Sequence, residues 1–160
     1  MLPRLLVLFW LAWPGGSAFA QDSASEQAVR AAMVFNFLKF TEWPTVENRL
    51  KLCISSGDPR QIEVLENLAG KHVRGQALIV VRFHPRETDC QVLYVDSRYR
   101  WEEVLAGRPA VSRTLTIGAY GGFAWDGGMI EIARQEGSTR FDINLPEVRR
   151  AGLRLYPQLL

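Results

Sequence analysis

The sequence predicts a three-layer α/β domain with a mixed β-sheet and a β-hairpin near its C-terminus. Between residues 50 and 117, apolar runs of strand length alternate with segments of helical periodicity, which is typical of a parallel sheet covered by helices. Two alternating segments, 129–134 and 139–145, then flank a Gln-Glu-Gly-Ser turn, the pattern of a hairpin. The sequence shows no internal repeat and no linker, so we expect one domain at residues 21–160.

The first twenty residues are predicted to be a cleaved export signal. Arg4 provides a positive start, residues 5–13 form a short apolar core, and Ala-Phe-Ala at 18–20 is the small-x-small pattern that signal peptidase cleaves. An apolar run of this length is too short to span about 30 Å of hydrocarbon, which argues against a membrane anchor. We therefore expect cleavage before Gln21 and a mature chain long enough for one domain with a substantial core.

A helix is predicted directly behind this signal. It would begin at a capping box formed by Ser23 and Glu26 and end at the Trp-Pro pair at 43–44, because the residue before proline avoids helical geometry. The helix would carry two apolar stripes. The stripe expected to cover the sheet comprises Ala28, Ala31, Ala32, Phe35 and Leu38. The opposite stripe, which must be covered by another part of the domain, by a second subunit or by a partner, comprises Val29, Met33, Phe37 and Phe40.

The remaining elements are bounded by capping residues, prolines and glycines. Two of the apolar runs are continuous, which predicts central strands covered on both faces. In chain order we expect a strand at 50–56, a helix from Asp58 to Gly70, central strands at 77–83 and 91–95, a helix from Asp96 to Gly107, a strand at 113–117, the hairpin, and a short helix from Pro146 to Gly152.

The two cysteines, Cys53 and Cys90, are predicted to form a disulfide. Both fall on predicted strands, and neighbouring strands bring Cα atoms into the range that a disulfide requires. Closing a loop of this length stabilises a fold by roughly 3–4 kcal/mol in the chain-entropy model. Two buried free thiols and a redox-sensitive pair are the alternatives. No Cys-x-x-Cys motif is present, so thiol-exchange catalysis has little support.

Little in the sequence points to catalysis, to a metal or to nucleic acid. The net charge is +2 and the arginines are spread along the chain, so no electrostatic footprint for nucleic acid is present. His72 and His84 are the only histidines, and we expect surface or turn roles for both rather than a metal site. Neither a Gly-x-Ser-x-Gly elbow nor a phosphate-binding P-loop occurs. We therefore expect no catalytic residue and no cofactor.

Residues 118–128 form a glycine-rich segment with three aromatic side chains. It follows a predicted strand, but a second strand comes next instead of the helix N-terminus that holds phosphate in nucleotide-binding loops. We expect the glycines to permit unusual backbone angles and the loop to display Tyr120, Phe123 and Trp125. These rings would either fold back on the core or form a contact patch. Nothing in the spacing of Asp126 and Glu131 favours a catalytic carboxylate pair.

Several blocks, taken together, resemble the YfiR family of exported proteins. The longest is residues 31–44, Ala-Ala-Met-Val-Phe-Asn-Phe-Leu-Lys-Phe-Thr-Glu-Trp-Pro. The others follow in the right order and are Lys51-Leu52-Cys53-Ile54, Gly70-Lys71-x-Val73-x-Gly75, Cys90-Gln91-Val92-Leu93-Tyr94, Gly127-Gly128-Met129-Ile130, Arg140-Phe141-Asp142-Ile143-Asn144-Leu145 and Arg150-Ala151-Gly152-Leu153-Arg154-Leu155. The resemblance covers nearly the whole mature chain, and the ordered set is specific.

The resemblance implies a Rossmann-like three-layer domain without a Rossmann cofactor, often dimeric, in the periplasm. Its best-understood members repress an inner-membrane diguanylate cyclase by binding the periplasmic sensor domain of that enzyme, and an outer-membrane lipoprotein relieves the repression. Lower cyclic-di-GMP then disfavours biofilm growth. Cys53 and Cys90 fall where the family places a structural disulfide. Some members carry a second cysteine pair, at whose positions this chain has Ala124 and Glu131.

The function predicted from these features is that of a non-catalytic signalling regulator that acts by protein contact. The residues expected to form the partner or dimer surface are Met33, Phe37, Phe40, Trp43, Tyr120, Phe123 and Trp125. The alternative is a small-ligand-binding or accessory module for a sensor kinase or an outer-membrane receptor, with the aromatic loop closing over a ligand at the carboxyl ends of the strands. An exported hydrolase is a third and weaker reading.

Overall fold

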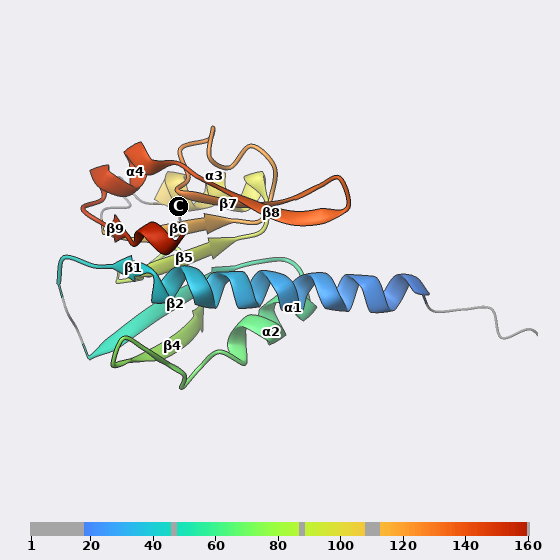
Figure 1. Ribbon diagram of the computed structural model, residues 1–160, viewed down its shortest axis with the longest axis horizontal. Coiled ribbons are helices and arrows are strands. Elements are labelled where there is room, and N and C mark those ends of the chain that lie inside the picture. Colours follow the sequence, from blue (N-terminus) through green and yellow to red (C-terminus); the bar gives the residue numbers. More distant parts are fainter. Residues whose placement is uncertain (1–17, 46–47, 87–88, 108–112, 160) are drawn as a thin grey trace, which may run out of the picture.

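The computed structural model describes residues 18–45, 48–86, 89–107 and 113–159, and it confirms the predicted α/β class. A seven-stranded sheet lies between α1 and α2 on one face and α3 on the other (Figure 1). The helices are α1 (Ala18–Lys39), α2 (Pro59–Glu66), α3 (Arg98–Gly107), α4 (Leu145–Arg150) and the 3-10 turn η1 (Pro157–Leu159). The strands are β1 (Thr41–Glu42), β2 (Arg49–Ser55), β3 (His72–Val73), β4 (Gln76–Arg82), β5 (Val92–Val95), β6 (Leu115–Gly118), β7 (Ile130–Gln135), β8 (Ser138–Ile143) and β9 (Arg154–Leu155).

The sheet is mixed and follows a doubly wound order. Its strands run β3-β4-β2-β5-β6-β7-β8, and the five from β4 to β7 are parallel, with antiparallel β3 and β8 at the edges. Among the parallel strands, the second in sequence lies outside the first, which is the flavodoxin-like order. The strand order therefore reverses between β2 and β5. In this type of fold, the crevice at the carboxyl ends of those two strands is the usual ligand position.

The core has two parts because the side chains of each strand alternate between the faces of the sheet. On β5, Val92 and Tyr94 face the larger cluster beneath α1 and α2. Leu93 and Val95 face the smaller cluster, which includes Trp101 of α3. All four residues of β5 are buried, as the continuous apolar run predicts. β4 is only partly covered, because it lies next to the edge strand β3 rather than at the centre of the sheet.

The C-terminal hairpin is confirmed. β7 and β8 pair in antiparallel fashion from Ile130–Ile143 to Gln135–Ser138. The two turn residues, Glu136 and Gly137, have φ angles of 50° and 81°. Positive φ at both central residues is what a type I′ turn requires, and that turn matches the twist of the flanking strands. The hairpin passes beside α1, where the Phe141 ring contacts that of Phe37 at a centroid distance of 5.1 Å (Figure 1).

Helix α1 differs from the prediction at both ends. Its backbone is already helical at Ala18, so Ser23 and Glu26 lie inside the helix instead of capping it. It ends at Lys39, before the Trp-Pro pair, and Thr41 and Glu42 form the short strand β1 with β9. The Thr41 hydroxyl donates to the carbonyl of Phe37 at 2.7 Å. Pairing with β9 thus takes the chain out of the helix earlier than proline would.

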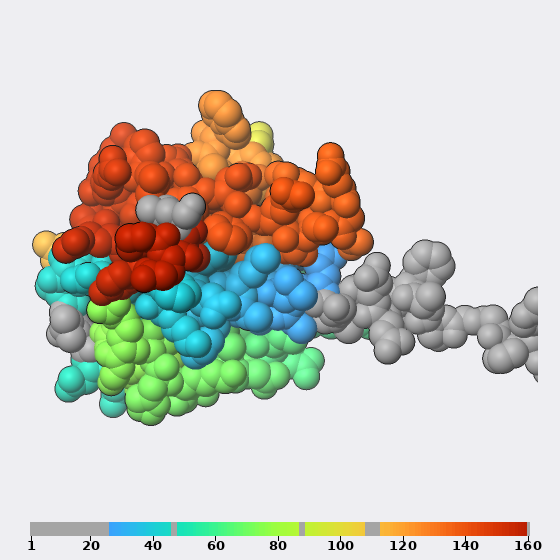
Figure 2. Space-filling model, viewed as in Figure 1, coloured from blue at the N-terminus to red at the C-terminus, as the bar shows by residue number. Residues whose placement is uncertain are grey.

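The two apolar stripes of α1 are rotated from their predicted places. The side chains that face the core are Ala31, Val34, Phe37 and Leu38. Ala28 and Ala32, which were expected to lie on the sheet, are exposed beside α2, and Phe35 is half-buried there. Figure 2 shows α1, in blue, with the orange hairpin on one side and green α2 on the other. The hairpin therefore packs on Met33 and Phe37 of the second stripe, while Val29 of that stripe is exposed. Ala28, Ala32 and Phe35 of the first stripe border an open groove.

Candidate functional site

The disulfide between Cys53 and Cys90 is present, which confirms the predicted pairing. The two Cα atoms are 5.8 Å apart. Cys53 lies on β2, and Cys90 lies two residues before the start of β5, the parallel neighbour of β2. Both cysteines are buried in the smaller core cluster with Trp101 and Phe123. A bridge in this position holds the two central strands together beneath α3 and is shielded from solvent.

The crevice at the switch point is occupied by a side chain of the protein itself. Asp96, just after β5, accepts hydrogen bonds from the Ser56 hydroxyl and the Gly57 amide, both at 2.6 Å. The Gly57 amide is the kind of donor that holds phosphate in doubly wound folds. Because the Asp96 carboxylate already takes this donor, an anionic ligand would be repelled here. The geometry does not favour a nucleotide or phosphate site at this point of the fold.

A cluster of polar side chains lies at the end of the sheet beneath α1. Asp58 caps α2 by accepting from the Arg60 amide at 2.9 Å, and the Gln27 side chain of α1 donates to it at 2.8 Å. Burial raises the pKa of Asp58, but the hydrogen bonds from Gln27 and from the backbone of Arg60 and Gln61 outweigh it and lower the pKa. The N-cap predicted from the sequence is thus confirmed, and it also ties α1 to α2.

The hydroxyl group of Tyr94 is expected to destabilise the fold. The residue is fully buried, burial raises the pKa of its phenol, and the hydroxyl has no hydrogen-bond partner in the described part of the chain. A buried polar group without a partner costs about 1–3 kcal/mol. We expect Tyr94→Phe to raise the free energy of unfolding by about 1 kcal/mol, measured by urea denaturation at constant m-value.

Tyr156→Phe is the matched control for this substitution. The Tyr156 hydroxyl donates to Glu42 at 3.3 Å, so its removal should leave stability unchanged or slightly lower. A Tyr94→Phe variant that loses stability would show that the Tyr94 hydroxyl is hydrogen-bonded in solution.

The glycine-rich loop at 118–128 is held rigidly from within. Glu131 is buried and its two carboxylate oxygens accept from the amides of Gly122 and Ala124, each at 3.1 Å. Asp126 forms an ion pair with Arg98 at 3.1 Å and accepts from the Tyr120 hydroxyl at 3.0 Å. Both carboxylates are therefore used to fix the loop. This arrangement is that of a rigid display loop, and it gives no support to a lid that closes over a ligand.

The three aromatic side chains of this loop differ in solvent exposure. Phe123 is fully buried, and its ring packs edge-on against Trp101 at 5.0 Å and Tyr120 at 5.4 Å. Tyr120 is half-buried. Trp125 is 94% exposed at the tip. Phe123 thus folds back on the core, whereas Trp125 is displayed and its role in a contact patch stays a prediction.

The residues predicted to form the partner surface do not gather in one place. Phe37 and Trp43 are buried within the chain, and the Trp43 indole donates to the Gln91 carbonyl at 3.1 Å. With Phe123, these side chains belong to the core, so we remove all three from the proposed contact surface. Met33, Phe40 and Tyr120 are half-buried, and Trp125 is exposed.

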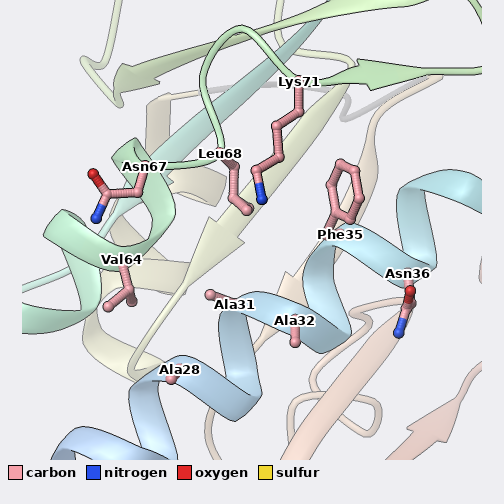
Figure 3. Close-up of a pocket in the computed structure, with 9 residues that line it drawn as sticks. All are labelled: Ala28, Ala31, Ala32, Phe35, Asn36, Val64, Asn67, Leu68 and Lys71. Atoms are coloured by element: carbon pink, nitrogen blue, oxygen red, sulfur yellow. The ribbon is translucent and has the colours of Figure 1, made fainter.

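An open groove between α1 and α2 was missed by the sequence reasoning. It has a volume of about 390 Å³, and Figure 3 shows the nine side chains that line it. Its floor is formed by Ala31 and Leu68, with Val64 and Phe35 along the walls. The signal was present in the sequence, since Ala28, Ala32 and Phe35 lie on one stripe. Small side chains on a helical stripe leave room beside the helix, but we assigned that stripe to the sheet.

The histidines do not suggest a metal centre. His72 and His84 are both exposed, on β3 and after β4. Within residues 18–45, 48–86, 89–107 and 113–159, no three His, Cys, Asp or Glu side chains gather as metal ligands. Over the same residues, no helix has both the length and the hydropathy needed to cross a bilayer.

The fold and its disulfide define the class: a doubly wound α/β domain whose two central strands are joined by one buried bridge. The chain belongs to the YfiR/HmsC-like family, whose model matches residues 27–160. The match begins in α1 and includes every strand, so the family resemblance predicted from the sequence blocks is confirmed. No curated protein matches the sequence closely enough to be reported as a relative.

Proposed function

We propose that the chain is a non-catalytic periplasmic regulator that represses an inner-membrane diguanylate cyclase by binding its periplasmic sensor domain. Repression would lower cyclic-di-GMP and biofilm formation. Membership of the YfiR/HmsC-like family over residues 27–160 supports this proposal. The buried disulfide fits an oxidising compartment, as does the predicted signal at residues 1–20. We further propose that the mature chain forms a homodimer and that an outer-membrane lipoprotein relieves the repression.

The observation that carries the proposal of action by contact is the exposure of Trp125. Large aromatic side chains on a rigid support are the commonest anchors of protein interfaces, because little conformational entropy is lost when they bind. The loop below Trp125 is fixed by Glu131 and Asp126, as described above. Because this indole is exposed, the free chain lacks the hydrophobic stabilisation that burial of the ring would give. A partner that covers Trp125 gains that free energy on binding.

Deletion of the gene is expected to raise cellular cyclic-di-GMP. A plasmid copy of the natural sequence should restore the low level, because the cyclase is again repressed. A copy with Trp125→Ser should restore it only partly, since loss of a buried aromatic anchor costs roughly 2 kcal/mol of binding. The measurement is cyclic-di-GMP quantified by mass spectrometry in the parent strain, the deletion strain and each complemented strain, alongside the amount of the regulator in each.

Tyr99→Ser is the matched control, because Tyr99 is also an exposed aromatic residue but lies on α3. It should restore the low level fully. Unchanged cyclic-di-GMP on deletion would overturn the cyclase as partner and would favour a sensor kinase or an outer-membrane receptor.

A further inference from the structure

The groove between α1 and α2 has an apolar floor and a positively charged end. Phe35 lies at that end, with the Lys39 ammonium 4.8 Å and the Lys71 ammonium 5.3 Å from its ring centroid. Figure 3 shows the Lys71 side chain directed back over the groove towards Phe35 and Leu68. In the part of the chain that the structure describes, neither lysine pairs with a carboxylate. The two ammonium groups thus remain available to an anionic group that lies against Phe35.

The groove is open along its length rather than enclosed. Five of its lining residues are exposed, namely Ala28, Ala32, Asn36, Asn67 and Lys71. Small-molecule sites usually bury most of the ligand surface, which an open channel cannot do. The α1 wall from residue 28 to residue 36 extends about 12 Å at 1.5 Å per residue, which matches two to three turns of a helix. The dimensions suit a peptide segment better than a compact ligand.

The walls determine which kind of segment fits. One wall is α1, and the other is the end of α2 together with the turn from residue 67 to residue 71. The backbone amides of that turn are bonded within the chain, as are those of the helices, so neither wall offers an edge to which a strand could add. An occupant must satisfy its own backbone, as a helix does. The alanine side chains of α1 also let a second helix approach closely, with its larger apolar side chains filling the space above Ala31 and Leu68.

We propose that this groove binds an amphipathic helix of a partner protein, with an aspartate or glutamate at the end that reaches Lys39 and Lys71. The apolar face of that helix would lie on Ala28, Ala32 and Leu68, and its acidic residue beside Phe35. This deepens the proposed function, on which it rests only in that the chain acts by protein contact. The inference names the surface and the chemistry of the segment, whichever protein carries it.

The test is site-specific photo-crosslinking in intact cells that express the full chain. A benzophenone amino acid replaces Asn67 on the rim of the groove, and the same residue replaces Ala106, exposed on α3, as the control position. We expect an adduct from position 67 and none from position 106. Mass spectrometry of the crosslinked peptide should place it in an acidic amphipathic helix of another protein.

Two further substitutions make the result specific for the groove. Ala32→Trp fills the channel, and Lys71→Glu reverses its charge; both side chains are exposed, so the melting temperature should stay unchanged. Each is expected to reduce the adduct roughly tenfold. The matched controls are Ala106→Trp and Arg149→Glu, two exposed positions outside the groove, and both should leave the adduct intact.

The outcomes separate this inference from the proposed function. An adduct that survives Ala32→Trp and Lys71→Glu, an adduct to a second copy of this chain, or the absence of an adduct overturns the helix-binding groove. A groove-dependent adduct to an acidic helix outside the cyclase supports the groove, and the cyclic-di-GMP measurement then decides the cyclase as partner separately. The same adduct within the periplasmic domain of the cyclase supports both.

Discussion

Replacing both cysteines with alanine is expected to lower the free energy of unfolding by about 4 kcal/mol. The bridge joins residues that are 37 positions apart, and closing a loop of that length removes this much entropy from the unfolded chain in the chain-entropy model. Loss of the bridge also leaves the smaller core cluster less well filled, because Cys53 and Cys90 both pack there. For a domain of this size the melting temperature should fall by roughly 8–16 °C.

The measurement is thermal unfolding followed by circular dichroism, with and without dithiothreitol. Reductant should lower the melting temperature of the natural chain, although slowly, because Cys53 is fully buried and Cys90 nearly so. The Cys53→Ala, Cys90→Ala variant should not respond to reductant at all, which makes it the control for nonspecific effects. A double variant as stable as the natural chain would contradict a structural role and would leave only a redox-sensitive pair.

Gly118→Ala is expected to destabilise the fold by about 3 kcal/mol. An added Cβ at Gly118 would lie 2.1 Å from Cγ of Phe123, far inside van der Waals contact. The ring cannot move aside, because Phe123 is fully buried between Trp101 and Tyr120. Gly118 is also the last residue of β6, paired with both neighbouring strands, so its backbone cannot shift freely. Urea denaturation of the purified variant measures the loss.

Gly121→Ala is the matched control in the same loop. A Cβ there meets no heavy atom within 4 Å, and the residue is not at positive φ. The Gly121→Ala variant should therefore be as stable as the natural chain. A double-mutant cycle identifies the cause, since Gly118→Ala combined with Phe123→Leu should cost less than the sum of the two single changes. Strict additivity would contradict a clash between Gly118 and Phe123.

The sequence predicted those features that local chemistry decides. Asp58 followed by proline is a strong helix start because the carboxylate and the missing proline amide both suit the first turn, and α2 begins there. The disulfide could be predicted because the sequence has only two cysteines, both at predicted strands, in a chain expected to reach an oxidising compartment. The hairpin follows from a glycine that can adopt positive φ between two alternating segments.

What the sequence could not predict is which surface covers which side chain. Helical periodicity shows that α1 has two apolar stripes, but it does not show whether the sheet, the hairpin or α2 lies against each. Phe37 is buried, and the residue that packs on its ring, Phe141, comes from a hairpin a hundred residues away in sequence. The strands β1 and β9 were missed for the same reason, since a two-residue strand forms only through its distant partner.

In the aromatic loop, too, the sequence does not show which side chains become buried. Phe123 and Trp125 lie two positions apart in the same glycine-rich segment, yet one is fully buried and the other almost fully exposed. The difference arises because Gly118 and Gly128 together leave a slot of the size of one ring, which Phe123 fills. Such a slot exists only once β6 and β7 are paired, so no local pattern reveals it.

The short sheet between β1 and β9 restricts the order in which the parts of the domain can fold. It pairs Thr41 with Leu155 and Glu42 with Arg154, so the segment that leaves α1 is held by a strand more than a hundred residues later in the sequence. The edge-on contact between the rings of Phe141 and Phe37 also forms only once the late hairpin is in place. If the chain is exported from its N-terminus, as proposed above, the first helix can dock fully only after β9 has crossed the membrane. Topology alone then delays closure of the domain until that strand is available to pair with β1.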